Sequence, residues 1–177
     1  MGSHDTPRLS ALLRGDRDAI RLAFLLQATL PGAPCMYYGD EIGMAGGLEP
    51  ESRAGFPWDE SRWDHELLAF ARAAFATRHA EPLLRHGVLA VLAASDHALA
   101  FERRVADGRA PSLVVAMNAG ARDVSLDVGG PVRREPGPEI VALPGMASPS
   151  VQVAEDGRLR VGLGRRSGAI IRVEAEA

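Results

Sequence analysis

Four residues near the N-terminus could do chemistry: His4, Asp5, Glu49 and Arg53. His4 and Asp5 are neighbours, so an imidazole that can donate a hydrogen bond stands beside a carboxylate that can only accept one. Glu49 and Arg53 lie together in a Gly/Pro-rich stretch. Taken singly, each has an ordinary explanation: the first pair as a loop turn with a helix-start charge, and Arg53 as a surface charge.

The elements that must position these residues alternate between helical periodicity and one short apolar run. Thr6 before a proline predicts a helix N-cap, with the helix reaching about Leu13. Asp16 predicts the N-cap of a second helix, which ends at Pro31. Ala33–Tyr38 is apolar and followed by glycine, which is typical of a buried parallel strand, although a buried helical turn has the same pattern.

A Gly/Pro-rich loop is predicted from Gly39 to about Asp59, and another helix within residues 63–82. One side of this helix is apolar: Leu67, Phe70, Ala71, Ala74 and Phe75. A helix, a buried strand and a second helix indicate a layered α/β arrangement.

From Gly87 onward the pattern changes to short β runs, which predict an antiparallel sandwich. Three hairpins are expected, with turns at Ser95–His97, Asn118–Arg122 and Asp156-Gly157, the last being a strong two-residue turn signal. The predicted strands are Val88–Ala94, Leu99–Val105, Leu113–Met117, Val124–Val128, Val151–Ala154, Leu159–Leu163 and Ala169–Val173.

Composition excludes several classes of partner. The net charge of −3 gives no basic footprint for nucleic acid or an anionic membrane, and no apolar run is long enough to span a bilayer. A single cysteine, Cys35, excludes an internal disulfide framework and favours a reducing, cytoplasmic compartment. The start does not read as a secretory signal, and its first four letters also match the beginning of an expression tag.

Taken together and in order, the N-terminal strings resemble the α-amylase family (glycoside hydrolase family 13), and above all its cyclomaltodextrinase, neopullulanase and maltogenic amylase branch. The strings that carry the resemblance are His4–Arg8, Pro31–Gly43, Glu49–Arg53 and Trp58–Asp59. The resemblance implies α/β plus all-β architecture: the last two βα units of a (β/α)8 TIM barrel in residues 1–84, then an antiparallel β-sandwich, domain C, in residues 85–177.

The resemblance also implies roles for single residues. Asp5 matches the carboxylate that grips hydroxyls of the distorted sugar in retaining glycoside hydrolysis, and His4 would donate to the same hydroxyls. Arg53 matches an arginine at the end of that subsite. Glu49 stands where the branch usually has aspartate, so its carboxylate is displaced by about one bond length. Ser52 replaces a cysteine, which predicts a packing change.

Other matched residues, Tyr37, Tyr38, Asp40 and Glu41, are expected to brace the barrel rim rather than touch sugar. The family's nucleophile and acid/base carboxylates lie on earlier strands, and no other carboxylate of this chain has a similar context. We therefore expect no glycosidase activity from the chain alone. No cofactor or metal site is predicted; calcium sites in the family lie mostly upstream.

The resemblance implies an α-glucan oligosaccharide as ligand and the N-terminal catalytic half of the same enzyme as partner. The resemblance leaves starch, pullulan and cyclodextrins open as the α-glucan. The chain would be a piece of a longer protein, one product of a split gene, or a stand-alone module without catalysis. A non-catalytic carbohydrate-binding module is the alternative function, but Phe101 is the only aromatic residue after His86. Without its partner, the chain is expected to self-associate through Cys35–Tyr38, and a homo-oligomer is compatible with the sequence.

Overall fold

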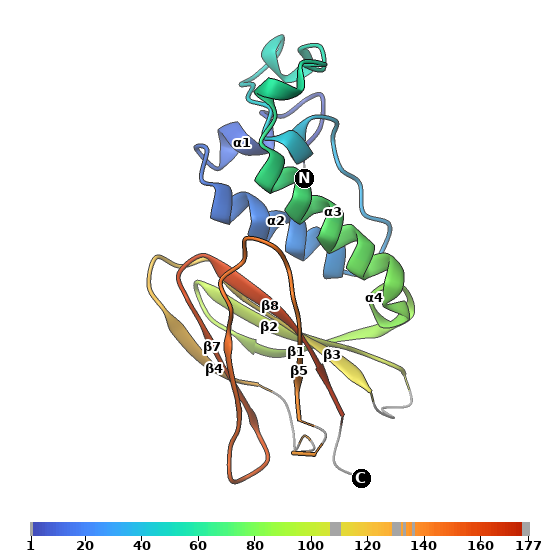
Figure 1. Cartoon of the computed structure of the whole chain (residues 1–177), viewed down its shortest axis with the longest axis vertical. Coiled ribbons are helices and arrows are strands. Elements are labelled where there is room, and N and C mark those ends of the chain that lie inside the picture. The colour runs from blue at the N-terminus through green and yellow to red at the C-terminus, as the bar shows by residue number, and fades with distance from the viewer. Residues whose placement is uncertain (1, 107–110, 129–131, 133, 136, 175–177) are drawn as a thin grey trace.

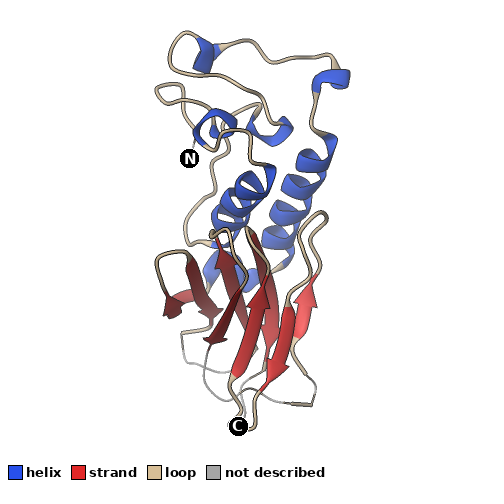
Figure 2. Cartoon of the chain, turned by 90° about the vertical axis from the view of Figure 1, so that its left-hand side faces the viewer, coloured by secondary structure: helices blue, strands red, loops and turns tan. Residues whose placement is uncertain are grey.

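The computed structural model describes residues 2–106, 111–128, 132, 134–135 and 137–174. A layer of helices from the first half of the chain covers one face of a five-stranded sheet, and a three-stranded sheet covers the other face (Figures 1 and 2). The loops between the first helices and α3 form the end of the molecule farthest from the strands, at the top of Figure 1.

The helical layer contains four α-helices and three short 3-10 turns within the described residues. These are α1 (Leu9–Leu12), α2 (Arg17–Thr29), η1 (Asp40–Ile42), η2 (Glu51–Arg53), η3 (Glu60–Arg62), α3 (His65–Ala80) and α4 (Pro82–His86). In the described part of the chain, no helix combines the length and hydropathy of a membrane-spanning segment.

Side-chain caps set the starts of α2, α3 and η3, from Asp16, Asp64 and Asp59. Asp16 accepts from the Ala19 amide at 3.0 Å and caps α2, as predicted. The predicted cap of α1 is wrong: the helix begins after Arg8, which makes no side-chain cap bond. The Thr6 hydroxyl instead accepts from the Ser3 amide at 3.1 Å, so it is used inside the preceding turn. The predicted apolar side of α3 is confirmed, with Phe75 only partly buried.

The strands form two antiparallel sheets. In the first sheet the order is β1-β2-β3-β8-β5, and in the second it is β4-β7-β6. The strands are β1 (Val88–Ala94), β2 (Ala98–Arg104), β3 (Ser112–Asn118), β4 (Val124–Val128), β5 (Glu139–Val141), β6 (Ser150–Val153), β7 (Leu159–Leu163) and β8 (Ser167–Val173). The predicted run of short antiparallel strands and the hairpins β1–β2 and β6–β7 are therefore confirmed.

The predicted hairpin between β3 and β4 is wrong. β3 pairs with β2 and β8, whereas β4 pairs with β7 in the other sheet. Asn118, at 1% exposure, fixes this crossing: its amide nitrogen donates to the carbonyls of Arg122 (2.7 Å) and Gly164 (2.9 Å), and its oxygen accepts from the Gly120 amide (2.9 Å). The buried amide thereby ties the turn after β3 to the turn after β7.

β3 lies in the middle of the five-stranded sheet and is covered on both faces, which explains why all seven of its residues are buried. Leu113, Val115 and Met117 point to the helices, while Val114 and Ala116 point to the second sheet. A strand covered on both sides reads as one continuous apolar run instead of an alternating one.

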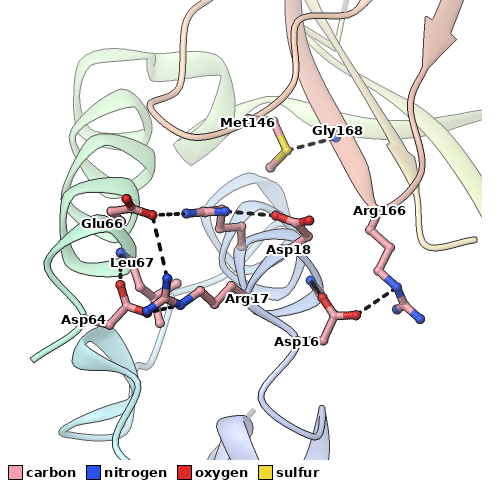
Figure 3. A network of polar contacts seen from close by, with 11 residues as sticks. Asp16, Arg17, Asp18, Asp64, Glu66, Leu67, Met146, Arg166 and Gly168 are labelled. Carbon is pink, nitrogen blue, oxygen red and sulfur yellow. Dashed lines mark hydrogen bonds and ion pairs between the residues drawn. The ribbon is translucent and has the colours of Figure 1, made fainter. Parts of the chain in front are cut away.

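The helical layer touches the sheet most closely at Gly168 of β8. A Cβ atom there would lie 2.6 Å from Leu25 Cδ2 and 3.1 Å from the Ala116 carbonyl oxygen, so only glycine leaves room for α2. The Gly168 amide donates to the Met146 sulfur at 3.2 Å (Figure 3).

Ion pairs at the start of α2 connect this helix to α3 and to the strands. Arg17 Nε lies 2.6 Å from Asp64 Oδ2, which joins α2 to the residue that caps α3. Asp16, besides capping α2, lies 3.0 Å from Nε of Arg166 in the turn between β7 and β8 (Figure 3). One carboxylate thus serves the helix and the sheet at once.

At the other end of α2, two buried arginines bind its terminal carbonyls. Arg78 of α3 donates to the carbonyls of Ala28 (2.8 Å) and Leu30 (2.9 Å). Arg103 of β2 donates to the Thr29 carbonyl and to that of Gly87. Since a helix leaves its last carbonyls without internal partners, these guanidinium groups stabilise the end of α2 in a place that water does not reach.

The predicted parallel strand is absent. Ala33–Tyr38 forms no ladder, and Ala33, Pro34 and Cys35 are exposed, so the prediction of a buried strand or helical turn is wrong. A parallel strand needs neighbouring strands to bond with, and every strand pair in the described residues is antiparallel. The structure accordingly does not confirm the predicted barrel portion.

Candidate functional site

All four residues predicted from the sequence lie together, although they come from two distant segments. The His4 Nε2 and Asp5 Oδ2 atoms are 3.0 Å apart, and Arg53 Nη2 lies 3.4 Å from Asp5 Oδ1. Arg53 Nε also lies 3.4 Å from Glu49 Oε1. We call His4, Asp5, Glu49 and Arg53 the polar cluster.

The polar cluster faces solvent, with side-chain exposures between 47% for Arg53 and 68% for Asp5. Exposed ion pairs contribute only about 0–1 kcal/mol to stability because water screens them. These contacts therefore cannot hold the two segments together by themselves, and the same groups stay accessible to a ligand.

Hydrogen bonds to the backbone hold the segments in place. Ser52, which is fully buried, donates from Oγ to the His4 carbonyl at 3.0 Å. The Tyr37 hydroxyl donates to the Ser52 carbonyl (3.2 Å) and the Tyr38 hydroxyl to the Ala54 carbonyl (2.8 Å). The two tyrosines thus fix the backbone on either side of Arg53. The buried position of Ser52 is compatible with the predicted packing change, and its hydroxyl in addition joins the two segments.

Arg8 lies beneath the two tyrosines and is completely buried. Its guanidinium carbon is 4.8 Å from the ring centre of Tyr37 and 4.5 Å from that of Tyr38, and Nη1 donates to the Tyr38 carbonyl at 2.5 Å. The backbone amide of Arg8 donates to the Gly46 carbonyl at 3.0 Å. Sequence reasoning gave Arg8 no role, since its partners are thirty residues away along the chain.

Asp40 is also buried, at 3% exposure, close to Arg8. Burial raises the pKa of the Asp40 carboxyl, against the lowering effects of the Leu9 amide and of Arg8. The Arg8 Nη1 and Asp40 Oδ1 atoms are 3.9 Å apart, too far for a hydrogen bond. Asp40 Oδ1 and two nitrogens of Arg8 make no hydrogen bond, so this pair is incompletely satisfied.

A cavity of about 660 Å³, separate from the polar cluster, lies between the β1–β2 turn and the segment that joins β3 to β4. It is lined by residues 95–98, 118 and 120–124. None of the polar cluster lines it. Within the described part of the chain, no three His, Cys, Asp or Glu side chains gather in a way that would hold a metal ion.

The polar cluster is suited to hydrogen-bond adjacent hydroxyl groups of a ligand. The Asp5 and Glu49 carboxylates each contact one guanidinium and keep further lone pairs with which to accept hydrogen bonds. His4 supplies a ring nitrogen beside Asp5, and Arg53 supplies N–H donors. An exposed set of donors and acceptors on fixed backbone matches a ligand that carries several hydroxyls.

Comparisons with known proteins agree with this reading. The family model described as "Alpha amylase, catalytic domain" matches residues 1–87. A cyclomaltodextrinase from Geobacillus thermopakistaniensis is 47% identical over 96 residues, which cover 54% of this chain and 16% of that protein. An amylopullulanase from Thermoanaerobacter thermohydrosulfuricus is 30% identical over 195 residues, covering 97% of this chain and 13% of that protein.

A solved structure supports the similarity in three dimensions. The debranching enzyme from Nostoc punctiforme matches with a TM-score of 0.76 and 32% identity, over 96% of this chain and 34% of that one. The chain therefore spans about a third of that structure, and about a sixth or less of the two relatives above.

Proposed function

We propose that this chain, whose residues 1–87 belong to the α-amylase family, contributes the sugar-gripping part of a retaining α-glucan glycoside hydrolase. The observation that carries the proposal is the polar cluster, in which three contacts of 3.0–3.4 Å link His4 to Asp5, Asp5 to Arg53, and Arg53 to Glu49. The α-glucan class comes from the relatives, whose names include cyclomaltodextrinase and amylopullulanase.

In this proposal Asp5 accepts hydrogen bonds from two hydroxyls of the sugar whose glycosidic bond is broken. Arg53 orients the Asp5 carboxylate, and His4 donates to an adjacent hydroxyl. Such bonds accelerate the reaction when they strengthen as the ring flattens toward the oxocarbenium-like transition state. The extra methylene of Glu49 is accommodated because Arg53 reaches its carboxylate as well.

Bond cleavage itself needs a nucleophile and a proton donor, two carboxyl groups about 5–5.5 Å apart across the reacting bond. Both carboxylates of the polar cluster are engaged by one guanidinium, which suits hydroxyl binding better than attack or proton donation. We assign nucleophile and acid/base to the N-terminal catalytic half, which would pair strands with residues 33–38 and complete a (β/α)8 barrel. Residues 33–38 belong to no strand, and Ala33, Pro34 and Cys35 are exposed, which supports this assignment.

The test is complementation. The chain is mixed or co-produced with an α-amylase-family segment that carries the first six barrel strands, and hydrolysis of maltoheptaose and cyclomaltodextrin is measured. We expect no turnover by the chain alone and turnover by the mixture. Asp5→Asn should then lower kcat by roughly 10²–10³, the loss found when one transition-state hydrogen-bonding group is removed.

Asp127→Asn is the matched control, because Asp127 is similarly exposed and paired with an arginine, Arg160, but belongs to β4. It should leave kcat unchanged. Turnover by the chain alone, or full activity of the Asp5→Asn mixture, would contradict the proposal. Tight maltoheptaose binding by the chain alone, without turnover in any mixture, would instead favour a non-catalytic binding module.

A further inference from the structure

Four aromatic side chains form a row in the loop that leads into α3. Trp58 lies 4.9 Å from Phe56 between ring centres, at 61°, and Phe56 lies 5.7 Å from Trp63, at 69°. Trp63 is followed by His65 at 6.2 Å. We call Phe56, Trp58, Trp63 and His65 the aromatic row. Such edge-to-face contacts are the favoured geometry for aromatic rings.

Trp58 stands at the solvent end of this row and is 83% exposed, the highest value among the exposed large hydrophobic residues in the described part of the chain. Its neighbours in the chain are held on both sides. The Trp63 indole nitrogen donates to the Pro57 carbonyl at 2.6 Å. Asp59 accepts from the amide (3.0 Å) and hydroxyl (2.7 Å) of Ser61 and thereby caps η3.

The exposed indole of Trp58 packs against a second ring, and hydrogen bonds fix the chain on both sides of it. It is therefore held in place for contact with a ligand. Leaving so large an apolar surface in water is unfavourable, and such surfaces mark binding sites. Trp58 belongs to the same stretch of chain as Arg53, and the Ala54 carbonyl between them is held by Tyr38. Five residues of chain span at most about 18 Å, so an oligosaccharide bound at the polar cluster is long enough to reach Trp58.

We propose that Trp58 is a second carbohydrate contact, whose ring stacks against the C–H face of a glucopyranose unit of the α-glucan. The unit is a neighbour of the sugar held by the polar cluster. The identity of the sugar rests on the proposed function, whereas the stacking rests on the aromatic row. An oligosaccharide of several units is then required for full affinity, and a monosaccharide reaches only one of the two places.

The chain has two tryptophans, so each can be isolated as the sole indole. Trp63→Phe leaves Trp58, and Trp58→Phe leaves Trp63 as the matched control. Titration with maltoheptaose should produce a saturable blue shift of indole emission in Trp63→Phe and none in Trp58→Phe. Sorbitol, which has hydroxyls but no pyranose face, should shift neither.

A second measurement does not depend on the Trp63 substitution. In calorimetry, Trp58→Ala should weaken maltoheptaose binding about tenfold, which corresponds to about 1.4 kcal/mol. About 50 Å² of apolar surface covered by stacking is enough for this. Because Trp58 is exposed, the variant is expected to fold.

The two proposals fail in different ways. If Trp58 stacks on sugar but the polar cluster does not bind it, the emission shift persists unchanged when Asp5→Asn is added. If maltoheptaose binds in an Asp5-dependent manner while Trp58 emission stays constant and Trp58→Ala has wild-type affinity, the stacking proposal is wrong. A blue shift that depends on protein concentration and not on sugar would assign Trp58 to a contact between polypeptides, and would equally overturn it.

Discussion

The loops that carry the polar cluster and the junction between α2 and the five-stranded sheet both contain backbone carbonyls that need a hydrogen-bond donor in the interior. The two regions provide that donor in different surroundings. Both use a buried arginine that donates to backbone carbonyls: Arg8 in the loops and Arg103 at the junction. At the junction the arginine is two residues from Phe101 of the apolar core, whereas in the loops Arg8 lies against the rings of two tyrosines and near an incompletely bonded Asp40.

This difference suggests that the junction mainly determines stability, whereas the loops mainly determine ligand binding. The junction buries large side chains on both sides of a sheet, so it should account for most of the free energy of unfolding. The loops bury few apolar groups and expose the charged ones, so changes there should alter ligand binding more than folding. The following predictions test that separation.

The largest effect is expected at the centre of the junction. Phe101 of β2 is 1% exposed and packs against the helices, so Phe101→Ala should lower the free energy of unfolding by about 3–5 kcal/mol. The midpoint of urea unfolding measures this. Val91→Ala on the exposed side of β1 is the control and should change the midpoint little. Equal midpoints for the two variants would contradict the assignment of stability to the junction.

A smaller loss is expected where α2 crosses β8. Gly168→Ala places a methyl group against Leu25 and the Ala116 carbonyl, which should cost about 1–3 kcal/mol through overpacking. Gly55→Ala, in the loops, meets no atom within 4 Å and should be neutral. If thermal unfolding shows both substitutions to be neutral, the helix and the sheet are less closely packed than described.

In the loops, removing hydroxyls should affect binding more than stability. The double variant Tyr37→Phe, Tyr38→Phe keeps the rings on Arg8 but frees the carbonyls on both sides of Arg53. Each lost hydrogen bond should cost about 1 kcal/mol of stability. Maltoheptaose affinity, measured by calorimetry, should fall in the double variant and should not fall further when Arg53→Ala is added. An additive loss would show that the tyrosines do not act through Arg53.

The smallest effect concerns pH. Burial raises the pKa of Asp40 in the folded chain, so between its ordinary value and the raised value the folded state holds more protons than the unfolded state. Stability therefore falls as pH rises through that window, and Asp40→Asn removes this contribution. The urea midpoint of Asp40→Asn relative to the unaltered chain should rise from pH 4 to pH 7. Parallel pH profiles would contradict the sign.

Local patterns predicted the elements whose determinants lie within a few residues. Asp16 is found as the cap of α2 because a cap needs only the next three residues, and the Asp156-Gly157 turn needs only its own hairpin. The polar cluster was found through motifs, since nothing local brings Asp5 to Arg53.

The misses concern contacts between distant residues. The hydrogen bond from Asn118 to the Gly164 carbonyl fixes the crossing of the chain from the first sheet to the second. No turn pattern in the sequence predicts this crossing. Arg8 could have been suspected only from its place beside the predicted site. The apolar pattern of Ala33–Tyr38 predicts a strand correctly only when neighbouring strands are available, and the described residues offer none.

The covering of β3 and β8 on both faces has a consequence for how chains of this family are recombined. A cut between residues 84 and 85 would leave Phe101, Leu113, Val115 and Ile170 on a bare sheet face, because the buried side chains of their cluster come from α2, α3 and α4. The unit that can be exchanged between homologous chains is then the sandwich together with α2, α3 and α4. Chimeras joined upstream of Arg17 should remain soluble, whereas those joined at the apparent domain border should precipitate.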